Sequence, residues 1–254
     1  MLIDTHCHIH ETYYLLDVDE VIKRAHEAGV MQMICVGTNE SSSRRAIDFA
    51  KNHKDIFASI GVHPHDAKAG LGDVANLIDT NNKLIVAIGE IGLDYFHNHS
   101  SRDAQIQILE TQIELALKHN LPIIFHVREA FEDFWSILDN FQSDNRQIRG
   151  VLHSFTDNRN NAEEGLKRGL YIGVNGYSTF TKSESQKAMF ATLPLEKLLL
   201  ETDAPFLTPI PFRGKVNEPA FVKNIAEYHS AIRRIPFEEL ATVTTVNARV
   251  LFGF

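Results

Sequence analysis

Two histidines near the N-terminus have the spacing of metal ligands. His6 and His8 lie in the segment Asp-Thr-His-Cys-His, which follows the apolar residues Met1-Leu2-Ile3. In a β-strand, residues two apart point to the same face, so both imidazoles can bind one metal ion while Cys7 points the opposite way. We therefore expect half of a metal site at His6 and His8, and a core position for Cys7.

Four further segments place side chains that can bind metals after a short apolar run. These side chains are Glu90, Asp94, His126, His153 and Asp203. Strands that are buried on both faces read as continuous apolar runs, as in a parallel sheet covered by helices, and their ends meet at one rim. Nitrogen and oxygen donors without a thiolate suit Zn, Mn or Mg. The number of donors suits two divalent ions better than one, because a carboxylate can bridge a pair of ions.

Strand-like and helix-like segments alternate along the whole chain. The predicted strands lie near residues 2–6, 31–36, 56–60, 84–89, 122–126, 149–153, 170–174 and 197–201. The predicted helices lie near residues 18–28, 42–52, 102–119, 129–140, 158–168, 183–191, 219–229 and 236–254. Eight strand–helix units predict an α/β fold, the (β/α)8 TIM barrel. An open doubly wound sheet is the alternative, but the Gly-Glu-Ile-Gly segment at 89–92 is not a dinucleotide or P-loop pattern.

Length and composition limit the class of protein. The 254 residues are 44% hydrophobic, which predicts a single domain over residues 1–254. Only Cys7 and Cys35 are present, and neither a signal peptide nor an apolar run long enough to span a bilayer is evident, so we expect a soluble, cytoplasmic protein. The net charge of −8 argues against a protein that coats duplex nucleic acid, although local cations and metals could still grip a few phosphates.

The 13 histidines fall into groups with different predicted environments. Six follow apolar runs, namely His6, His8, His63, His65, His126 and His153. Four lie in helix-like stretches and are predicted to be solvated surface residues, namely His26, His53, His119 and His229.

Eight short motifs occur in order along nearly the whole chain. They are Asp4-Thr-His-Cys-His8, Gly61-Val-His-Pro-His65, Gly89-Glu-Ile-Gly-Leu-Asp-Tyr95, Ile124-Phe-His-Val-Arg128, His153-Ser-Phe155, Gly173-Val-Asn-Gly176, Glu201-Thr-Asp-Ala-Pro205 and Arg213-Gly-Lys-Val-Asn-Glu-Pro219. Each motif alone is weak, but their combination in this order is specific, and it closely resembles the TatD family of metal-dependent hydrolases, within the amidohydrolase-like barrels.

The resemblance implies a binuclear site. His6, His8 and Asp203 would hold the first metal, His126 and His153 the second, and Glu90 would bridge them. The end of the fourth strand offers Glu90 and no lysine, unlike barrels bridged by a carboxylated lysine. His10 stands where the family often has an acidic residue, and the segment 176–180 is a second variation, in a loop expected to border the substrate.

The implied reaction is hydrolysis by a metal-activated water. Asp203 would orient that water and take its proton, while His63 and Arg128 are candidate phosphate contacts and Arg213 is a weaker one. The leading hypothesis is a deoxyribonuclease of exonuclease type that acts on single-stranded DNA ends, without a protein partner. The alternative keeps the metals but cleaves an ester or amide, such as an aminoacyl-tRNA link. A non-catalytic metal-binding scaffold is the third hypothesis, which nothing in the sequence favours.

Each of these residues also has a structural interpretation. Glu90 could pair with a buried cation, and Asp203 could cap a turn. Asp94 could hydrogen-bond a ligand histidine or brace its own loop. His63 could stabilise the turn at Pro64, and Arg128 could form a surface ion pair with Glu129 or Glu132.

Overall fold

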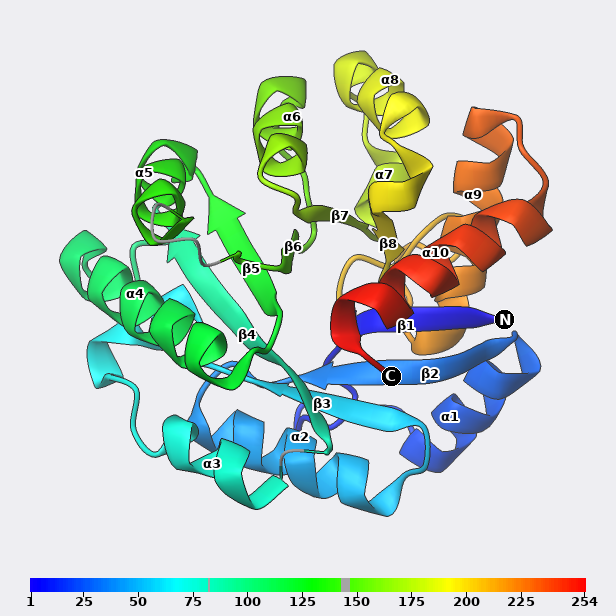
Figure 1. The fold of residues 1–254 in the computed structure, drawn as a ribbon. Helices are drawn as coiled ribbons and strands as arrows, with labels where there is room; N and C mark the ends of the chain where they lie inside the picture. The colour runs from blue at the N-terminus through cyan, green and yellow to red at the C-terminus, as the bar shows by residue number, and fades with distance from the viewer. Residues whose placement is uncertain (82, 143–146) are drawn as a thin grey trace. The chain divides into compact units, whose positions relative to one another are not determined.

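The fold is a (β/α)8 barrel, as the alternating segments predicted. The computed structural model describes residues 1–81, 83–142 and 147–254. In this part of the chain, eight strands form one sheet in the order in which they occur in the sequence, and helices alternate with them (Figure 1). The strands are β1 (Leu2–Cys7), β2 (Val30–Val36), β3 (Ile56–Ile60), β4 (Ile85–Asp94), β5 (Ile123–Arg128), β6 (Gly150–Leu152), β7 (Tyr171–Val174) and β8 (Leu198–Leu200).

The helices match the predicted stretches closely. The α-helices are α1 (Val18–Glu27), α2 (Glu40–Asn52), α3 (Val74–Asn81), α4 (Arg102–His119), α5 (Phe131–Gln142), α6 (Arg159–Lys167), α7 (Tyr177–Phe180), α8 (Glu184–Thr192), α9 (Val222–Arg233) and α10 (Phe237–Phe252). Three short 3-10 helices are η1 (Pro64–Ala69), η2 (Leu195–Lys197) and η3 (Pro219–Phe221). The elements η1, η2, α3 and α7 were not predicted, because none of them carries a long amphipathic repeat.

By its internal contacts the chain divides into two compact units. Unit 1 comprises residues 1–35 and 154–254, and unit 2 comprises residues 36–153. The assignment of residues 1–254 to a single domain therefore stays a prediction.

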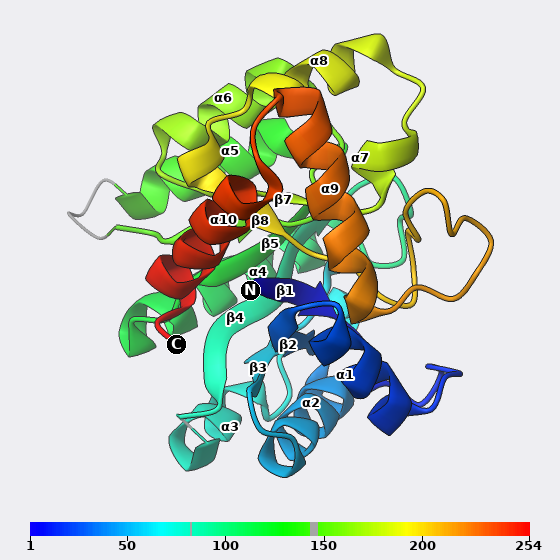
Figure 2. The same ribbon diagram turned by 90° about the vertical axis from the view of Figure 1, so that its right-hand side faces the viewer.

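Unit 1 joins the two ends of the chain. β1 pairs in parallel with β2, β7 pairs with β8, and β8 contacts β1. Helices α9 and α10 pack on β1 and supply buried apolar side chains such as Ile225 and Leu240 (Figure 2). The hydroxyl of Thr245 in α10 donates to the carbonyl of Met1 at 3.0 Å, which ties the last helix to the first strand.

Unit 2 is built on strands β3 to β6. Helix α4 packs on β4, and its predicted apolar stripe includes Leu109 and Ile113, both fully buried. Ser101 caps the N-terminus of α4 through the backbone N–H of Ala104, and Asn120 ends the helix in the left-handed conformation. The core of this unit therefore comes from one face of α4 and from continuous apolar strands.

Two expectations were wrong. The fourth strand was predicted to end at residue 89, but β4 continues to Asp94, so Glu90 and Asp94 lie within the strand. The polar residues hid this extension, because they interrupt the apolar run. His229 was predicted to be solvated, but its side chain is fully buried in α9 and contacts the hydroxyl of Ser178.

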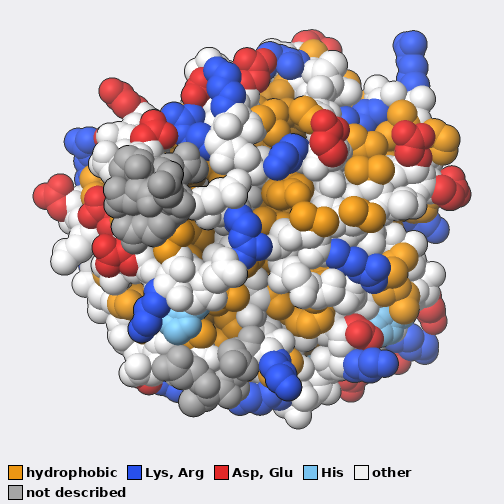
Figure 3. All heavy atoms as spheres, in the orientation of Figure 1, with side chains coloured by type: hydrophobic (Ala, Val, Ile, Leu, Met, Phe, Trp, Pro, Cys, Tyr) orange, Lys and Arg blue, Asp and Glu red, His pale blue; other side chains and the backbone are white. Residues whose placement is uncertain are grey.

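The surface matches the modest net charge. On the face drawn in Figure 3, basic and acidic side chains are interspersed among apolar and neutral ones, without a continuous field of one sign. Among the described helices, none combines the length and the apolar character needed to cross a membrane.

Candidate metal centre

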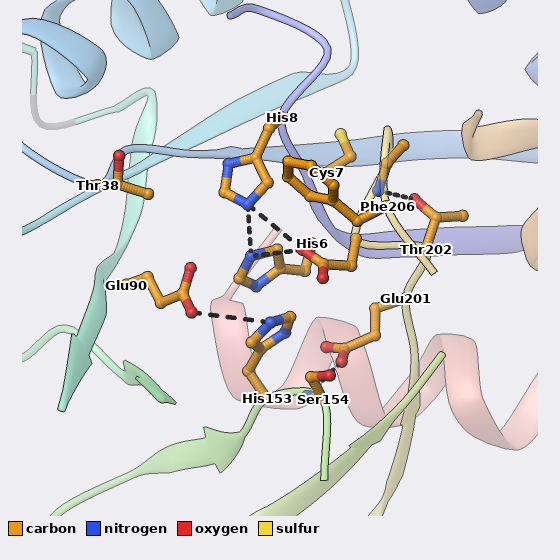
Figure 4. A network of polar contacts seen from close by, with 12 residues as sticks. His6, Cys7, His8, Thr38, Glu90, His153, Ser154, Glu201, Thr202 and Phe206 are labelled. Atoms are coloured by element: carbon orange, nitrogen blue, oxygen red, sulfur yellow. Dashed lines mark hydrogen bonds and ion pairs between the residues drawn. The ribbon is translucent and has the colours of Figure 1, made fainter. Parts of the chain in front are cut away.

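In unit 1, three donor atoms converge at the ends of β1 and β8. His6 Nε2 lies 3.1 Å from His8 Nε2, and Asp203 Oδ1 lies 3.7 Å from the first and 3.4 Å from the second. Figure 4 shows the two imidazole rings directed at each other from β1 and the residues after it. We call His6, His8 and Asp203 the triangle, because each residue supplies one corner.

The spacing of the triangle fits a divalent ion. Two ligands that bind one ion tetrahedrally at about 2.1 Å lie ~3.4 Å apart, close to the three observed separations. The side chains of His6 and His8 are buried and that of Asp203 is 15% exposed, so one corner remains open to solvent. Two neutral nitrogens and one carboxylate oxygen are a donor set that Zn and other divalent ions accept.

Backbone hydrogen bonds hold the segment after β8 against β1. The N–H of Asp203 donates to the carbonyl of His6 at 2.8 Å, and the N–H of His8 donates to the carbonyl of Ala204 at 2.8 Å. Asp203 has a φ of 60°, in the left-handed region that Asp tolerates better than most residues. This unusual backbone directs a carboxylate towards two histidines almost 200 positions earlier in the chain.

The buried side chain of Asp4 also holds β1 and the segment after β8 together. Its Oδ1 accepts the N–H of Thr202 at 2.8 Å and that of His6 at 3.3 Å, and its Oδ2 accepts the hydroxyl of Thr202 at 2.5 Å. Burial raises the pKa of Asp4, against these hydrogen bonds, which lower it. Asp4 thus belongs to the support of the triangle rather than to its donors.

In unit 2, donors gather around Glu90 in β4. Glu90 Oε1 lies 2.8 Å from His126 Nδ1, 3.6 Å from His63 Nε2 and 3.8 Å from His153 Nε2. Figure 4 shows Glu90 and His153 directed towards each other. Donor atoms of His63, Glu90 and His126 all lie within 4.8 Å of one another, which is compatible with one metal ion. His63, predicted to contact phosphate, therefore also lies at the distance of a ligand.

Asp94 combines both of the roles considered for it. Its Oδ2 lies 3.2 Å from His126 Nε2, and its Oδ1 accepts the backbone N–H groups of Phe96 and His97 at 3.0 Å. It therefore contacts a candidate ligand and also braces its own loop. Burial alone would lower the pKa of His126, but hydrogen bonds to Asp94 and Glu90 raise it to about 9.

The remaining predicted residues have varied surroundings. His63 accepts the N–H of His65 through Nδ1 at 3.2 Å, so it also stabilises the turn at Pro64, and burial lowers its pKa to about 3. The exposed guanidinium of Arg128 lies 4.2 Å from the centre of the Phe96 ring, and within the described ranges it makes no ion pair with Glu129 or Glu132.

The last two predicted positions, Arg213 and His10, each contact residues of their own unit. The guanidinium of Arg213 donates to the carbonyl of Thr208 at 2.8 Å and lies 3.7 Å from the centre of the Phe180 ring. His10 is buried beside Glu11, 3.5 Å away; burial lowers its pKa, but contacts with Cys35 and Glu11 raise it to about 9. Cys7 is fully buried, as its alternation in the strand predicted.

Some candidate residues were not identified from the sequence. Tyr13 and Phe206 are half exposed on the loops that follow β1 and β8, and their ring centres are 6.1 Å apart. His97 contacts Asp94. An aromatic or histidine in a polar loop has no periodic signal, so only the fold reveals its neighbours.

Comparison with known proteins places this arrangement in a family. A family model described as TatD related DNase matches residues 3–253. The chain belongs to the TatD family. The metal-dependent hydrolase YabD of Bacillus subtilis, described as uncharacterized, is 40% identical to this TatD chain over 99% of both proteins. A protein of Erwinia amylovora named 3'-5' ssDNA/RNA exonuclease TatD is 35% identical over 99% of this chain and 100% of that protein.

A solved structure agrees with the sequence relatives. The crystal structure of YJJV, a TatD homolog from Escherichia coli K12, matches with a TM-score of 0.92 and 30% identity, over 100% of this chain and 98% of that chain. This TatD-family protein is therefore a metal-dependent hydrolase with a barrel fold.

Proposed function

We propose that this TatD-family hydrolase is an exonuclease that removes nucleotides from the 3′ ends of single-stranded DNA. The main observation behind the proposal is the triangle, because its donor spacing fits a divalent ion. The Erwinia relative supports the substrate and the polarity, since it is named as a 3'-5' exonuclease of single-stranded DNA and RNA.

We infer that each unit supplies the ligands of one divalent ion, Mg, Mn or Zn. His6, His8 and Asp203 would hold the first ion, and Glu90, His126 and His153 the second. All of these residues lie in the C-terminal part of a strand or just after one, which is the end where the active sites of this fold lie. Bound divalent ions would lower the pKa of a water molecule and neutralise charge on phosphoryl oxygens.

The protein side chains have separate tasks in this proposal. Asp203 is the group that accepts the proton of the attacking water, because its carboxylate lies beside the proposed first ion and is partly open to solvent. Asp94 orients the His126 ring through the contact with Nε2, so that Nδ1, which faces Glu90, would be the nitrogen that binds the ion. His63 and Arg128 contact the phosphate, and the exposed planar guanidinium of Arg128 suits a bidentate contact.

Exposed aromatic rings would hold the bases. Tyr13 and Phe206 expose 49% and 52% of their surface, and Phe206 donates its backbone N–H to the carbonyl of Asp203 at 2.8 Å. Aromatic side chains stack on the bases of single strands without strong sequence preference. A few stacking and phosphate contacts are compatible with a protein whose net charge is −8.

The test is cleavage by protein stripped of metal with a chelator and resupplied with Mg, Mn or Zn. The substrates are single-stranded DNA labelled at its 5′ end, the same DNA labelled at its 3′ end, and RNA of the same sequence. We expect metal-dependent shortening from the 3′ end. Glu90→Gln should abolish it, while Glu110→Gln, an exposed residue of α4, should retain it.

The other outcomes separate the alternatives. Metal binding without cleavage of DNA or RNA would contradict the proposal, and release of the amino acid from an aminoacyl-tRNA would then identify an ester hydrolase. Metal binding without hydrolysis of any of these substrates would identify a scaffold.

A further inference from the structure

A second group of histidines surrounds Asp94 in unit 2. His65 Nε2 lies 2.9 Å and His97 Nδ1 lies 2.8 Å from Asp94 Oδ2. The ring of His99 lies 4.6 Å from that of His65 and stacks nearly parallel to that of His97, with centres 5.9 Å apart. We call His65, Asp94, His97 and His99 the outer group, since none of its histidines belongs to the ligands proposed above.

The outer group contains more imidazoles than are needed to support His126. Asp94 Oδ1 already accepts two backbone N–H groups, so three imidazole nitrogens, including that of His126, face Oδ2. One carboxylate oxygen has two lone pairs, so it accepts two hydrogen bonds well and a third poorly. The support of His126 requires one of these hydrogen bonds. His65 and His97 therefore lie beside a buried carboxylate although neither is needed to support His126.

We propose that the outer group is an additional binding site for a divalent transition metal ion. One donor atom each from His65, Asp94 and His97 lies within 4.8 Å of the others, and two contacts of 2.8 and 2.9 Å need to open only slightly to reach the ~3.4 Å of a tetrahedral site. His99 is exposed and close enough to His65 to approach as a fourth donor.

The donors and their exposure define which ions bind. Imidazole nitrogens suit Zn, Ni and Cu, whereas Mg prefers oxygen ligands and retains its waters. The side chains of His65 and His97 are 32% and 36% exposed, so an ion can reach them directly from solvent, whereas Asp94 is buried. The outer group is therefore selective for a transition metal even when Mg is in large excess.

Occupation of the outer group has a consequence for His126. Asp94 Oδ2 is the oxygen shared by both sets of contacts, so an ion bound there draws it from His126 Nε2, now 3.2 Å away. Loss of this contact weakens the support of a proposed ligand. The concentration of the transition metal thus determines whether Asp94 supports the His126 ring.

The experiment counts bound Zn by equilibrium dialysis in excess Mg, followed by metal analysis. The proteins are the wild type, the double variant His97→Asn/His99→Asn, and His119→Asn as a control that makes the same change at the end of α4. We expect the double variant to bind one equivalent less than the wild type and the control to bind the same number. Melting temperatures establish that each variant is folded.

A separate variant distinguishes this proposal from the proposed function. Glu90→Gln should lose Zn from its own donor group but retain the equivalent that the double variant loses. The triple variant, which combines all three substitutions, should therefore bind one equivalent less than Glu90→Gln. Equal Zn content in the wild type and the double variant would overturn the proposal. A loss of more than one equivalent in the double variant would also overturn it, because the outer group would then not be a separate site. An inactive protein that still shows the difference of one equivalent would contradict the proposed function alone.

Discussion

The donors of the triangle in unit 1 and the donors in unit 2 are positioned by different kinds of contact. In the triangle, Asp203 Oδ1 lies 3.4 Å from His8 Nε2 and 3.7 Å from His6 Nε2, and the donors are fixed by backbone hydrogen bonds and by Asp4. In unit 2, His126 hydrogen-bonds two carboxylates directly, Glu90 at 2.8 Å and Asp94 at 3.2 Å. In the triangle the two imidazoles contact each other at 3.1 Å and the carboxylate oxygen is farther away, whereas in unit 2 two carboxylates hydrogen-bond one imidazole.

This difference predicts different responses to a metal ion. The triangle is already spaced for a cation, so binding requires little rearrangement. In unit 2 the hydrogen bonds raise the pKa of His126 to about 9, so an ion must displace a proton that two carboxylates stabilise. Metal affinity in unit 2 should therefore depend more strongly on pH than that of the triangle.

The largest expected effect is that of Asp203→Asn in the triangle. The amide removes the negative charge and cannot accept a proton, so we expect kcat on single-stranded DNA to fall by about 10²-fold or more. Because the backbone contacts remain, the melting temperature should change little. Asp19→Asn, an exposed change in α1, is the matched control and should behave as the wild type. A kcat for Asp203→Asn close to that of the wild type would show that the triangle is not the catalytic region.

Gly92→Ala tests how unit 2 is assembled. Gly92 pairs with His126 across β4 and β5, has a φ of 152°, and a Cβ there would collide with the carbonyl of His126. We expect a loss of stability of about 3 kcal/mol, since the two strands must separate. Gly70→Ala is the control: its φ is 78° but its surroundings are open, so only backbone strain of about 1 kcal/mol is expected. Urea unfolding measures both, and equal losses would mean that the close approach of the strands is unimportant.

The pH dependence of stability separates a buried histidine without carboxylates from His126. Burial and nearby Arg233 lower the pKa of His229 to about 3. The hydroxyl of Ser178 donates to Asn175, so His229 Nε2 must donate to Ser178, and within the described residues its Nδ1 has no hydrogen-bond partner. Protonation would therefore place an uncompensated charge in the core.

The sign of the effect follows from the unfolded state. Unfolded His229 titrates near pH 6.5, so between about pH 6.5 and 3 the unfolded chain binds more protons, and stability falls as pH falls. Between pH 7 and 5 this residue should remove about 2 kcal/mol, whereas His229→Gln should lack that part of the slope. Denaturant unfolding at several pH values measures it. Parallel pH profiles for the two proteins would contradict the lowered pKa.

The error at His229 shows where the sequence was insufficient. Apolar runs predicted all eight strands, because continuous burial leaves a direct signal in the sequence. By contrast, His229 lies in a helix whose neighbouring polar residues resemble a solvated face, and its burial depends on contacts with Ser178, which is 51 positions away. Long-range contacts of this kind leave no local pattern.

The donor groups show the same division between local and long-range information. The strand spacing predicted that His6 and His8 point to the same side, but it could not reveal the left-handed backbone of Asp203. Asp94 was assigned two alternative roles, and the structure shows both, because β4 extends five residues beyond its predicted end. The outer group could not be foreseen, since His97 and His99 belong to no strand.

The smallest expected effect separates the exposed aromatic residues of the two units. Phe206 in unit 1 faces Tyr13 at 6.1 Å and exposes 52% of its surface, whereas Phe96 in unit 2 has Arg128 over its ring at 4.2 Å. A base can stack on an open ring face more readily than on one covered by a guanidinium. Phe206→Leu should therefore weaken the binding of single-stranded DNA by about 1 kcal/mol, a roughly fivefold rise in KM with little change in kcat. Phe96→Leu, the same change in unit 2, should raise KM less. An equal rise in both variants would mean that the single strand uses the aromatic residues of both units alike, and the reverse order would assign base stacking to Phe96.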